Sequence, residues 1–471
     1  MRCRYNKVTL FYFLYVITQD VRIMTSIIRF IRSRLKHYFD KIRNERIKMG
    51  ILQAIPFWTA SLVTGLIAVL YTKIFGFAEQ GAAYFFHLSP WLLFIITPAC
   101  FFLSVWIVKR FAPYARGSGI PQVVAAIELS NPKGTDKVNR LLSIPVVIVK
   151  IISSSILALG GGIIGREGPT IQIAGSIFRK INQWLPEWWP KVSKKNMIMT
   201  GAAAGLAAAF NTPLGGIVFA MEELTKTHIS FYKTAIFTAV IIAGITAQAF
   251  LGPYLYLGYP DVSNLSVFVF FAVVIVAVVA GLSASIMCKL ILKMLRWKNS
   301  LQNKWKIASY ILICSLIVAT MAFFGGEDVM NSGKGLMTHI LFTSDKYVHW
   351  YTPLLRITGS VVTFTSGAAG GVFAPALTAG ASIGSLFSGW MELSATNTNL
   401  LILAGMVAFL TGVTRSPFTS AILVLEMTDS HHIIFHLMLA AMTANLCAFF
   451  IDRHSFYDVL KRQYIRELHK E

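Results

Sequence analysis

The chain has 471 residues, of which 55% are hydrophobic and only 14% are charged. Soluble globular chains carry about 25% charged residues, so this composition excludes that class. A formal net charge of +22 would favour nucleic acid as the partner of a soluble protein, but here we expect no nucleic acid, because the basic residues flank long apolar stretches.

The basic residues are gathered in three places along the chain. Residues 1–49 form a basic segment before the first apolar stretch, and two further basic runs lie at 289–306 and 461–470. Lys and Arg beside apolar spans are typical of the cytoplasmic side of a membrane. The sequence therefore predicts a multi-pass protein of the cell membrane (inner or plasma membrane), with both termini in the cytoplasm and basic segments that contact anionic lipid headgroups of the bilayer.

Long stretches of the chain lack Asp, Glu, Lys and Arg altogether, and most of them reach the length of about 20 apolar residues that crosses the hydrocarbon core. Several contain Gly or Pro, which predicts two short or broken helices in place of one. The stretches are residues 49–72, 80–108, 196–221, 234–260, 262–288, 307–326, 357–391 and 430–451. We predict an all-α polytopic fold, with one membrane domain at 50–465 and a short C-terminal tail at 466–471.

An internal repeat divides this domain. At a constant offset of 204 residues, the repeat pairs Gly201 with Gly405, Pro213 with Pro417 and Glu222 with Glu426. A Gly- and Pro-rich break precedes each copy. Interrupted helices at corresponding places in two repeats are typical of transporters with a site near the bilayer midplane. The halves would span about 50–252 and 262–465, and the pattern leaves open whether they run parallel or inverted.

Three glycine-rich breaks carry the chemistry: GSGIP at 117–121, GREGP at 165–169 and GGVFAP at 370–375. Glycine lets the backbone turn tightly and approach a ligand closely. The helix that follows each break would present unpaired N–H groups and a partial positive charge of about half a unit. Taken singly, each break could equally be a packing site between helices. Converging near the midplane, the three would hold an anion weakly enough for it to leave again.

Glu167 lies in the second break. A carboxylate inside the membrane is costly and is a functional candidate by default. When ionised, Glu167 would occupy the helix ends that attract a free anion, and when protonated it would vacate them, so it could both gate the site and carry a proton. Ser118 offers a hydroxyl donor, although an ordinary helix cap would look the same. Glu222 and Glu223 are either a solvated pair at the membrane edge or an internal proton relay.

No cofactor is expected, and the five cysteines have no metal or disulfide spacing. An intramembrane enzyme that uses Glu167 as general acid or base is disfavoured, because no nucleophile, metal cluster or paired carboxylate lies near this residue in the sequence. We therefore predict no enzymatic activity.

From about residue 50 to 465 the sequence closely resembles the CLC family of chloride channels and chloride/proton antiporters. The three breaks match the family's signature motifs in order, and AAFNTPLGG at 208–216 and LEMTD at 425–429 add to the match. The resemblance implies a homodimer in which each subunit has its own anion pathway, built from tilted and partial helices in two inverted halves. Gln122 departs from the family, where Glu is common. The cytoplasmic nucleotide-binding domains of many eukaryotic members have no counterpart here, which is typical of a prokaryotic-type member.

The resemblance also assigns roles to single residues. Glu223 matches the internal proton glutamate of the antiporters, so a secondary active chloride/proton antiporter is expected, with a passive voltage- or pH-gated chloride channel as the alternative. Ser118 is typical of members that prefer chloride. The implied sites are a central chloride site formed by the hydroxyls of Ser118 and Tyr457 and the amides of Val372 and Phe373, an outer site at the amides of Arg166 to Gly168, and Glu167 as the gating and external proton glutamate.

Overall fold

The computed structural model describes residues 37, 39–40, 44–130, 134–224, 233–252, 255–263 and 265–470. Most of the predicted basic segment 1–49 lies outside them, as does residue 471. The chain divides into two compact units, one of Met1–Pro56 with Trp184–Val192, the other of Phe57–Gln183 with Ser193–Glu471. In the smaller unit, Trp189 donates a hydrogen bond from Nε1 to the Leu52 carbonyl, at 2.7 Å. The larger unit contains every predicted site residue.

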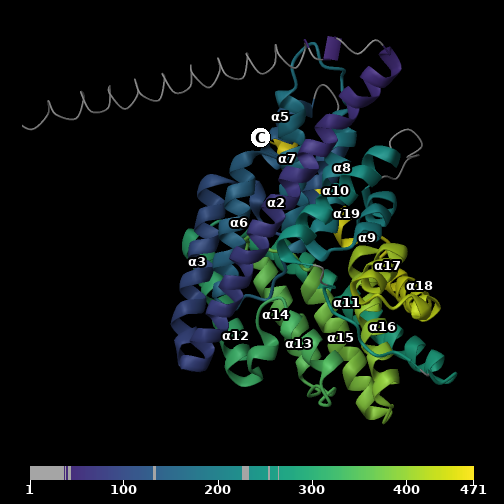
Figure 1. Ribbon diagram of the computed structural model, residues 1–471. Coiled ribbons are helices and arrows are strands. Elements are labelled where there is room, and N and C mark those ends of the chain that lie inside the picture. Colours follow the sequence, from purple (N-terminus) through teal and green to yellow (C-terminus); the bar gives the residue numbers. More distant parts are fainter. Residues whose placement is uncertain are drawn as a thin grey trace, which may run out of the picture. The chain divides into compact units, whose positions relative to one another are not determined.

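The described residues form helices joined by short turns, with no strand longer than an isolated bridge (Figure 1). The helices of the first half are α2 (Glu45–Leu88), α3 (Leu93–Phe111), α4 (Ile120–Glu128), α5 (Thr135–Leu141), α6 (Ile144–Leu159), α7 (Glu167–Trp184), α8 (Lys194–Phe210), α9 (Pro213–Phe219) and α10 (Lys233–Leu251). Those of the second half are α11 (Val269–Ser300), α12 (Lys304–Gly325), α13 (Lys334–Phe342), α14 (Thr352–Thr365), α15 (Phe373–Trp390), α16 (Ala395–Thr414), α17 (Pro417–Thr428), α18 (Ile434–Ile451) and α19 (Phe456–Lys470).

Within the described residues, eight helical segments are long and apolar enough to cross a membrane. Three predicted apolar stretches are broken, as their glycines and prolines indicated. The stretch 80–108 divides into α2 and α3 at a short turn that contains Pro90. The stretch 196–221 divides into α8 and α9 at Asn211, which has a left-handed φ of 57°. The stretch 357–391 divides into α14 and α15 at the third glycine break. Polytopic all-α architecture is therefore confirmed.

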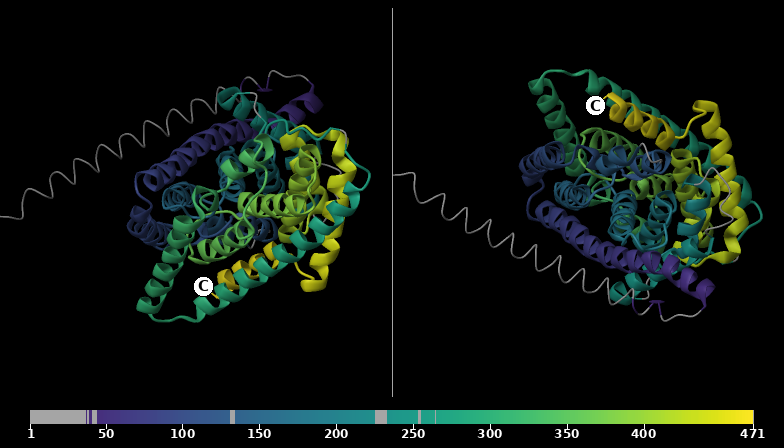
Figure 2. Two further views of the ribbon diagram at one scale, coloured as in Figure 1. Left: turned by 90° about the horizontal axis from the view of Figure 1, so that it is seen from below. Right: turned by 90° about the horizontal axis from the view of Figure 1, so that it is seen from above.

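The core of the larger unit lies around α16, which is buried along nearly its whole length. It packs against α11, α15 and α18. Helices α15 and α16 approach so closely that a Cβ added to Gly380 would meet the backbone of Gly405. In Figure 2, α19 lies alongside α11 in both views, and the two helices are in contact.

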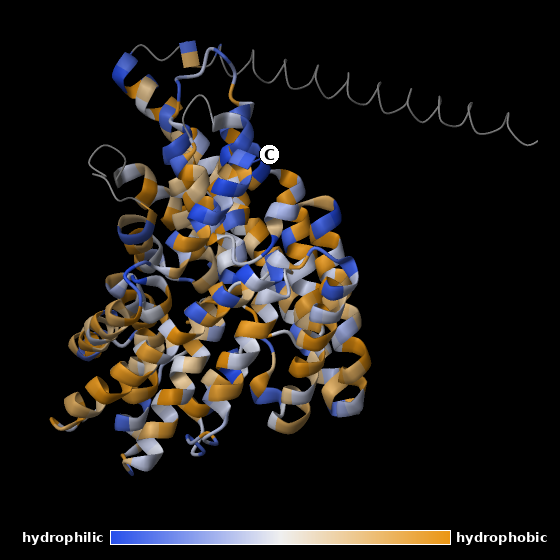
Figure 3. Cartoon of the chain, turned by 180° about the vertical axis from the view of Figure 1, so that it is seen from behind, coloured by the Kyte–Doolittle hydropathy of each residue, from blue (hydrophilic) through white to orange (hydrophobic). Residues whose placement is uncertain are grey.

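The outward helices of the larger unit are coloured mainly as hydrophobic in Figure 3, while hydrophilic residues gather near the end of α19. Many large apolar side chains on these helices are exposed, such as Ile95 at 71% and Phe450 at 87%. An aqueous surface would rarely present so large an apolar area. Lipid tails are the solvent that suits it.

The two repeated segments meet. The Glu222 carboxylate accepts hydrogen bonds from the amides of Phe418 (3.2 Å) and Thr419 (2.7 Å) in the first turn of α17. In return, the Glu426 carboxylate accepts from the amides of Leu214 (3.0 Å) and Gly215 (2.8 Å) in the first turn of α9. The glutamate near the end of α17 thus lies at the N-terminus of α9, and the glutamate in the π-helical segment Ala220–Leu224, which continues α9, lies at the N-terminus of α17. This is possible only if α9 and α17 run antiparallel, as elements of inverted repeats do.

Candidate functional site

The three glycine breaks come together in space, although more than 200 residues separate the second from the third. Gly117 donates its amide to the Ala368 carbonyl at 2.8 Å and accepts from the Gly370 amide at 3.1 Å, which joins the first break to the third. Gly165 and Gly371 exchange two backbone hydrogen bonds of 2.8 Å, which joins the second to the third. Helices α4, α7 and α15 therefore begin within one cluster of backbone.

Glycine is required at two of these positions. Gly119, which precedes α4, has a φ of 104°, a region that side chains with a Cβ rarely adopt. A Cβ at Gly168 would collide with the Ser118 hydroxyl, so this glycine lets the start of α7 lie against Ser118. The fully buried Lys150 on α6 adds support, because its Nζ donates to the carbonyls of Ala115 and Gly117, each at 2.7 Å.

Ser118 and Tyr457 lie near each other in this cluster, and each is only about 1% exposed. Their hydroxyls do not meet hydrogen-bond geometry with each other or with another described residue. A buried hydroxyl without a partner costs free energy, and native proteins rarely leave one so. A ligand that accepts hydrogen bonds would satisfy both.

The amides predicted for the central site lie at the start of α15. Val372 is the cap residue of this helix and Phe373 its first residue, and both are buried. The first amides of a helix have no carbonyl partner within the helix, so they are directed beyond its end. Arg166 and Gly168 flank Glu167 at the start of α7, where Thr170 donates its amide to the Arg166 carbonyl at 2.9 Å. The starts of α7 and α15 thus bring backbone donors to the glycine breaks, and the two buried hydroxyls add side-chain donors of a kind that suits a small anion.

Glu167 is about 1% exposed and is the first residue of α7. Its Oε1 accepts a hydrogen bond of 3.4 Å from the Tyr256 hydroxyl, while its Oε2 has no hydrogen-bond partner among the described residues. The Tyr256 ring in turn lies 4.4 Å from Lys334 Nζ, a cation–π arrangement. These residues line a cavity of about 740 Å³ that also reaches Arg166. The carboxylate therefore stands between an open cavity and the glycine breaks.

Sequence reasoning missed Tyr256 and Lys334. Tyr256 belongs to the connector between the predicted halves, in a run rich in Tyr and Pro that resembles an ordinary interfacial loop. Lys334 opens α13 outside any motif. No local signal distinguishes either residue, because only the fold brings them to Glu167.

The two adjacent glutamates near α9 have different partners. Glu222 caps α17, as described above. Glu223 is half-buried, and its Oε2 accepts a hydrogen bond of 2.9 Å from the Ser416 hydroxyl, just before α17. Its charge also acts electrostatically on Tyr457. Glu223 is thus the member of the pair that lies within electrostatic range of the cluster. Within the described part of the chain, no group of three or more His, Cys, Asp or Glu residues could hold a metal ion.

Comparison with known families bears on this arrangement. A family model described as voltage gated chloride channel matches residues 99–448. The chain belongs to this family. Among curated relatives, the H(+)/Cl(-) exchange transporter ClcA of Citrobacter koseri is 30% identical over 421 residues, covering 84% of this chain and 85% of the relative. The protein of the same name in Cronobacter sakazakii is 29% identical over 425 residues, covering 85% and 87%.

Solved structures give the same fold. The crystal structure of a slow cyanobacterial Cl-/H+ antiporter matches with a TM-score of 0.76 at 23% identity, covering 89% of this chain and 99% of that one. A CLC-type fluoride/proton antiporter matches with a TM-score of 0.72 at 19% identity, covering 88% and 98%. At these identities the likeness establishes the fold, so the predicted CLC architecture is confirmed.

Proposed function

We propose that this chain is a chloride/proton antiporter of its family. The observation that carries the proposal is the pair of buried, unpartnered hydroxyls of Ser118 and Tyr457 beside the converging starts of α4, α7 and α15. Chloride accepts hydrogen bonds and carries no donor, so it satisfies such groups. Two relatives that cover most of the chain and are named as H(+)/Cl(-) exchange transporters support exchange over passive conduction.

Chloride at the central site would be held by Ser118 and Tyr457 together with the amides of Val372 and Phe373. The amides of Arg166 to Gly168 would form the outer site. Because these donors are neutral, binding would be favourable without trapping the ion.

Glu167 would compete with chloride for the outer site. As a carboxylate it would fill the site itself, and after taking up a proton from the cavity it would release the site to chloride. Glu223 would supply protons from the opposite side. One proton would thus move inward or outward each time Glu167 leaves and returns, which couples the two fluxes.

The proposal extends to the assembly. Residues 50–465 would form the transport domain, with halves at about 50–252 and 262–465, flanked by cytoplasmic segments at 1–49 and 466–471. The protein would work as a homodimer in a cell membrane, surrounded by lipid, with both termini on the cytoplasmic side. Cross-linking in native membranes and cysteine labelling near the C-terminus from either side test these points.

The deciding experiment uses the purified full-length protein in liposomes. An outward chloride gradient should drive measurable proton uptake, and a proton gradient should drive chloride against its own gradient. Chloride flux with no accompanying pH change would show that the protein is a passive channel and not an antiporter. Absence of any chloride flux, with reconstitution verified, would refute both.

A further inference from the structure

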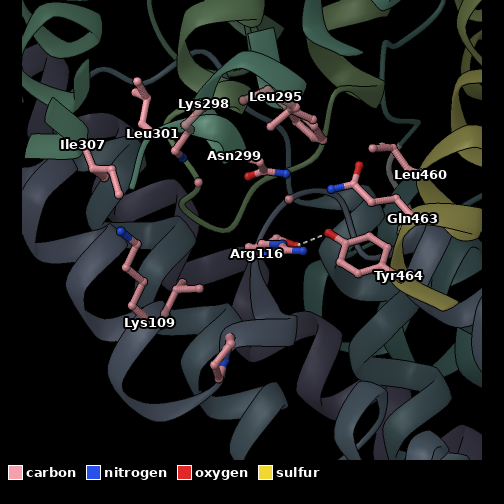
Figure 4. A pocket seen from close by; sticks show the side chains of 15 residues that line it. Lys109, Arg116, Leu295, Lys298, Asn299, Leu301, Ile307, Leu460, Gln463 and Tyr464 are labelled. Atoms are coloured by element: carbon pink, nitrogen blue, oxygen red, sulfur yellow. Dashed lines mark hydrogen bonds between the residues drawn. The ribbon is translucent and has the colours of Figure 1, made fainter. Parts of the chain in front are cut away.

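A second cavity lies apart from Glu167, between the ends of α3 and α11, the start of α12 and the helix α19. Its volume is about 250 Å³. Figure 4 shows its side chains. The basic residues Lys109, Arg116 and Lys298 line it together with the amide side chains of Asn299 and Gln463. No acidic residue is among the described residues that line it.

The positive charges of this cavity exceed the negative ones nearby. Arg116 pairs with the Glu467 carboxylate outside the lining. Lys298 donates from Nζ to the carbonyls of Thr365 (2.8 Å) and Ser366 (2.5 Å), which are neutral. Lys109 has an exposed side chain and no ion-pair partner in the described part of the chain. The positive charges of Lys109 and Arg116 also repel a positive charge on Lys298. The basic groups that line the cavity therefore outnumber the one carboxylate that pairs with them.

The size of the cavity selects among anions. At about 30 Å³ per water molecule, it holds roughly eight waters, far more than one chloride ion requires. Pockets for drug-sized molecules begin at about 300 Å³, so this cavity suits a small ligand or one group of a larger one. A phosphate-sized oxyanion with a few waters fits.

Charge and donor geometry point the same way. A dianion would compensate more of the positive charge of Lys109, Arg116 and Lys298 than a halide would. Arg and Lys are the side chains that bind phosphate oxygens, and the Asn299 amide supplies a neutral donor. The Gln463 amide donates to Glu467 Oε1 at 3.1 Å and has a second N–H. We propose that this cavity is a second anion site, which binds a phosphate dianion or the phosphomonoester group of a larger molecule.

The location allows two sources for that group. The cavity reaches the backbone of Gly117, one residue before Ser118, and it is lined by Leu460 and Tyr464 of the helix that carries Tyr457. Free phosphate could enter from the aqueous side of α19. Trp297 and Trp305 flank the α11–α12 turn and are 56% and 81% exposed, as in an aromatic belt at the membrane interface. A lipid headgroup that ends in a phosphomonoester could therefore enter at the same level.

Titration calorimetry with sodium phosphate on the purified full-length protein, at constant chloride, tests the site. We expect saturable binding that Lys109→Gln weakens about tenfold, since a hydrogen bond to a charged group is lost. Lys293→Gln removes an exposed charge from α11 outside the cavity and should leave the affinity unchanged. The proposal is overturned if phosphate shows no saturable binding, or if Lys109→Gln binds phosphate as tightly as the unaltered protein does. It is also overturned if Lys109→Gln and Lys293→Gln lose the same amount of phosphate affinity.

A competition experiment separates the two sources. The protein is placed in nanodiscs of phosphatidylcholine alone, or with phosphatidic acid, or with phosphatidylglycerol, whose phosphate is a diester. Phosphate binding weakened by phosphatidic acid and unaffected by phosphatidylglycerol assigns the site to a lipid phosphomonoester. Equal phosphate binding in all three membranes assigns it to the free ion. Unchanged thermal unfolding of Lys109→Gln shows that a loss of binding is not a loss of fold.

Discussion

Glu222, in the segment that continues α9, caps α17, and Glu426 of α17 caps α9. The first accepts two amides at the start of α17 and the second accepts two amides at the start of α9. The helix N-terminus attracts a negative charge, and a carboxylate with two amide donors is a strong cap. This reciprocal pair ties the two halves of the chain together at a point outside the glycine cluster.

Loss of either cap should weaken the protein without stopping transport. We expect Glu222→Ala and Glu426→Ala to lower the free energy of unfolding by about 1–2 kcal/mol each, the range of N-cap substitutions. Thermal unfolding in detergent measures the change, with the exposed Glu392→Gln as control. Full stability of both variants, or abolished chloride exchange in either folded variant, would contradict the capping role.

The Ser118 and Tyr457 hydroxyls should contribute jointly to chloride affinity. A hydrogen bond contributes about 1 kcal/mol net, which corresponds to about fivefold in affinity. We therefore expect about fivefold weaker chloride binding for Ser118→Ala and for Tyr457→Phe by titration calorimetry. Tyr347→Phe is the control, because its hydroxyl donates to the Leu393 carbonyl at 3.4 Å, beyond the C-terminal end of α15 and away from Val372 and Phe373 at its start. If both Ser118→Ala and Tyr457→Phe bind chloride with unchanged affinity, these hydroxyls are not part of the chloride site.

Glu167→Gln should separate the two fluxes. The amide side chain cannot take up a proton, so proton movement should fall to background while chloride flux continues. Parallel recordings of chloride and pH in liposomes measure both. Glu392→Gln should retain coupled exchange. Proton movement that persists in Glu167→Gln would assign the external proton to another group.

Lys150→Met should damage the first glycine break. The substitution leaves the carbonyls of Ala115 and Gly117 buried without their donor, and an unsatisfied buried group costs about 1–3 kcal/mol. We expect a loss of about 2–4 kcal/mol in unfolding free energy, together with weaker chloride binding because Ser118 is no longer held. Lys289→Met, at an exposed position of α11, should change neither quantity. Stability equal to that of the unaltered protein would show that the two carbonyls find other donors.

The sequence predicted the glycine cluster because its signal is local. Glycines and prolines at 117–121, 165–169 and 370–375 mark helix starts by their own conformational preferences, and the repeat related the second break to the third. The stretch Thr135–Leu159 was missed as a span, because the absence of charge was the criterion and Lys150 lies within it. The burial of that lysine is compensated internally, because its Nζ donates hydrogen bonds to two carbonyls.

Long-range partners could not be predicted in the same way. The capping role of Glu222 depends on the N-terminus of α17, nearly 200 positions later, and the contact of Tyr256 with Glu167 depends on the path of the connector between the halves. The repeat correctly paired Glu222 with Glu426, yet correspondence in sequence does not reveal contact in space.

The burial of α16 has a consequence for biogenesis. This helix is the least apolar of the candidate spans in the described chain and the most completely enclosed. It carries Asn397, Asn399 and Thr411 inside the protein. Newly made segments enter the bilayer in order, so α16 reaches the membrane after α11 and α15, two of the helices that cover it, and before α18. The retention of α16 in the membrane therefore depends on neighbours that are already in place. The second half is assembled in sequence, with the earlier helices providing the surroundings into which α16 packs.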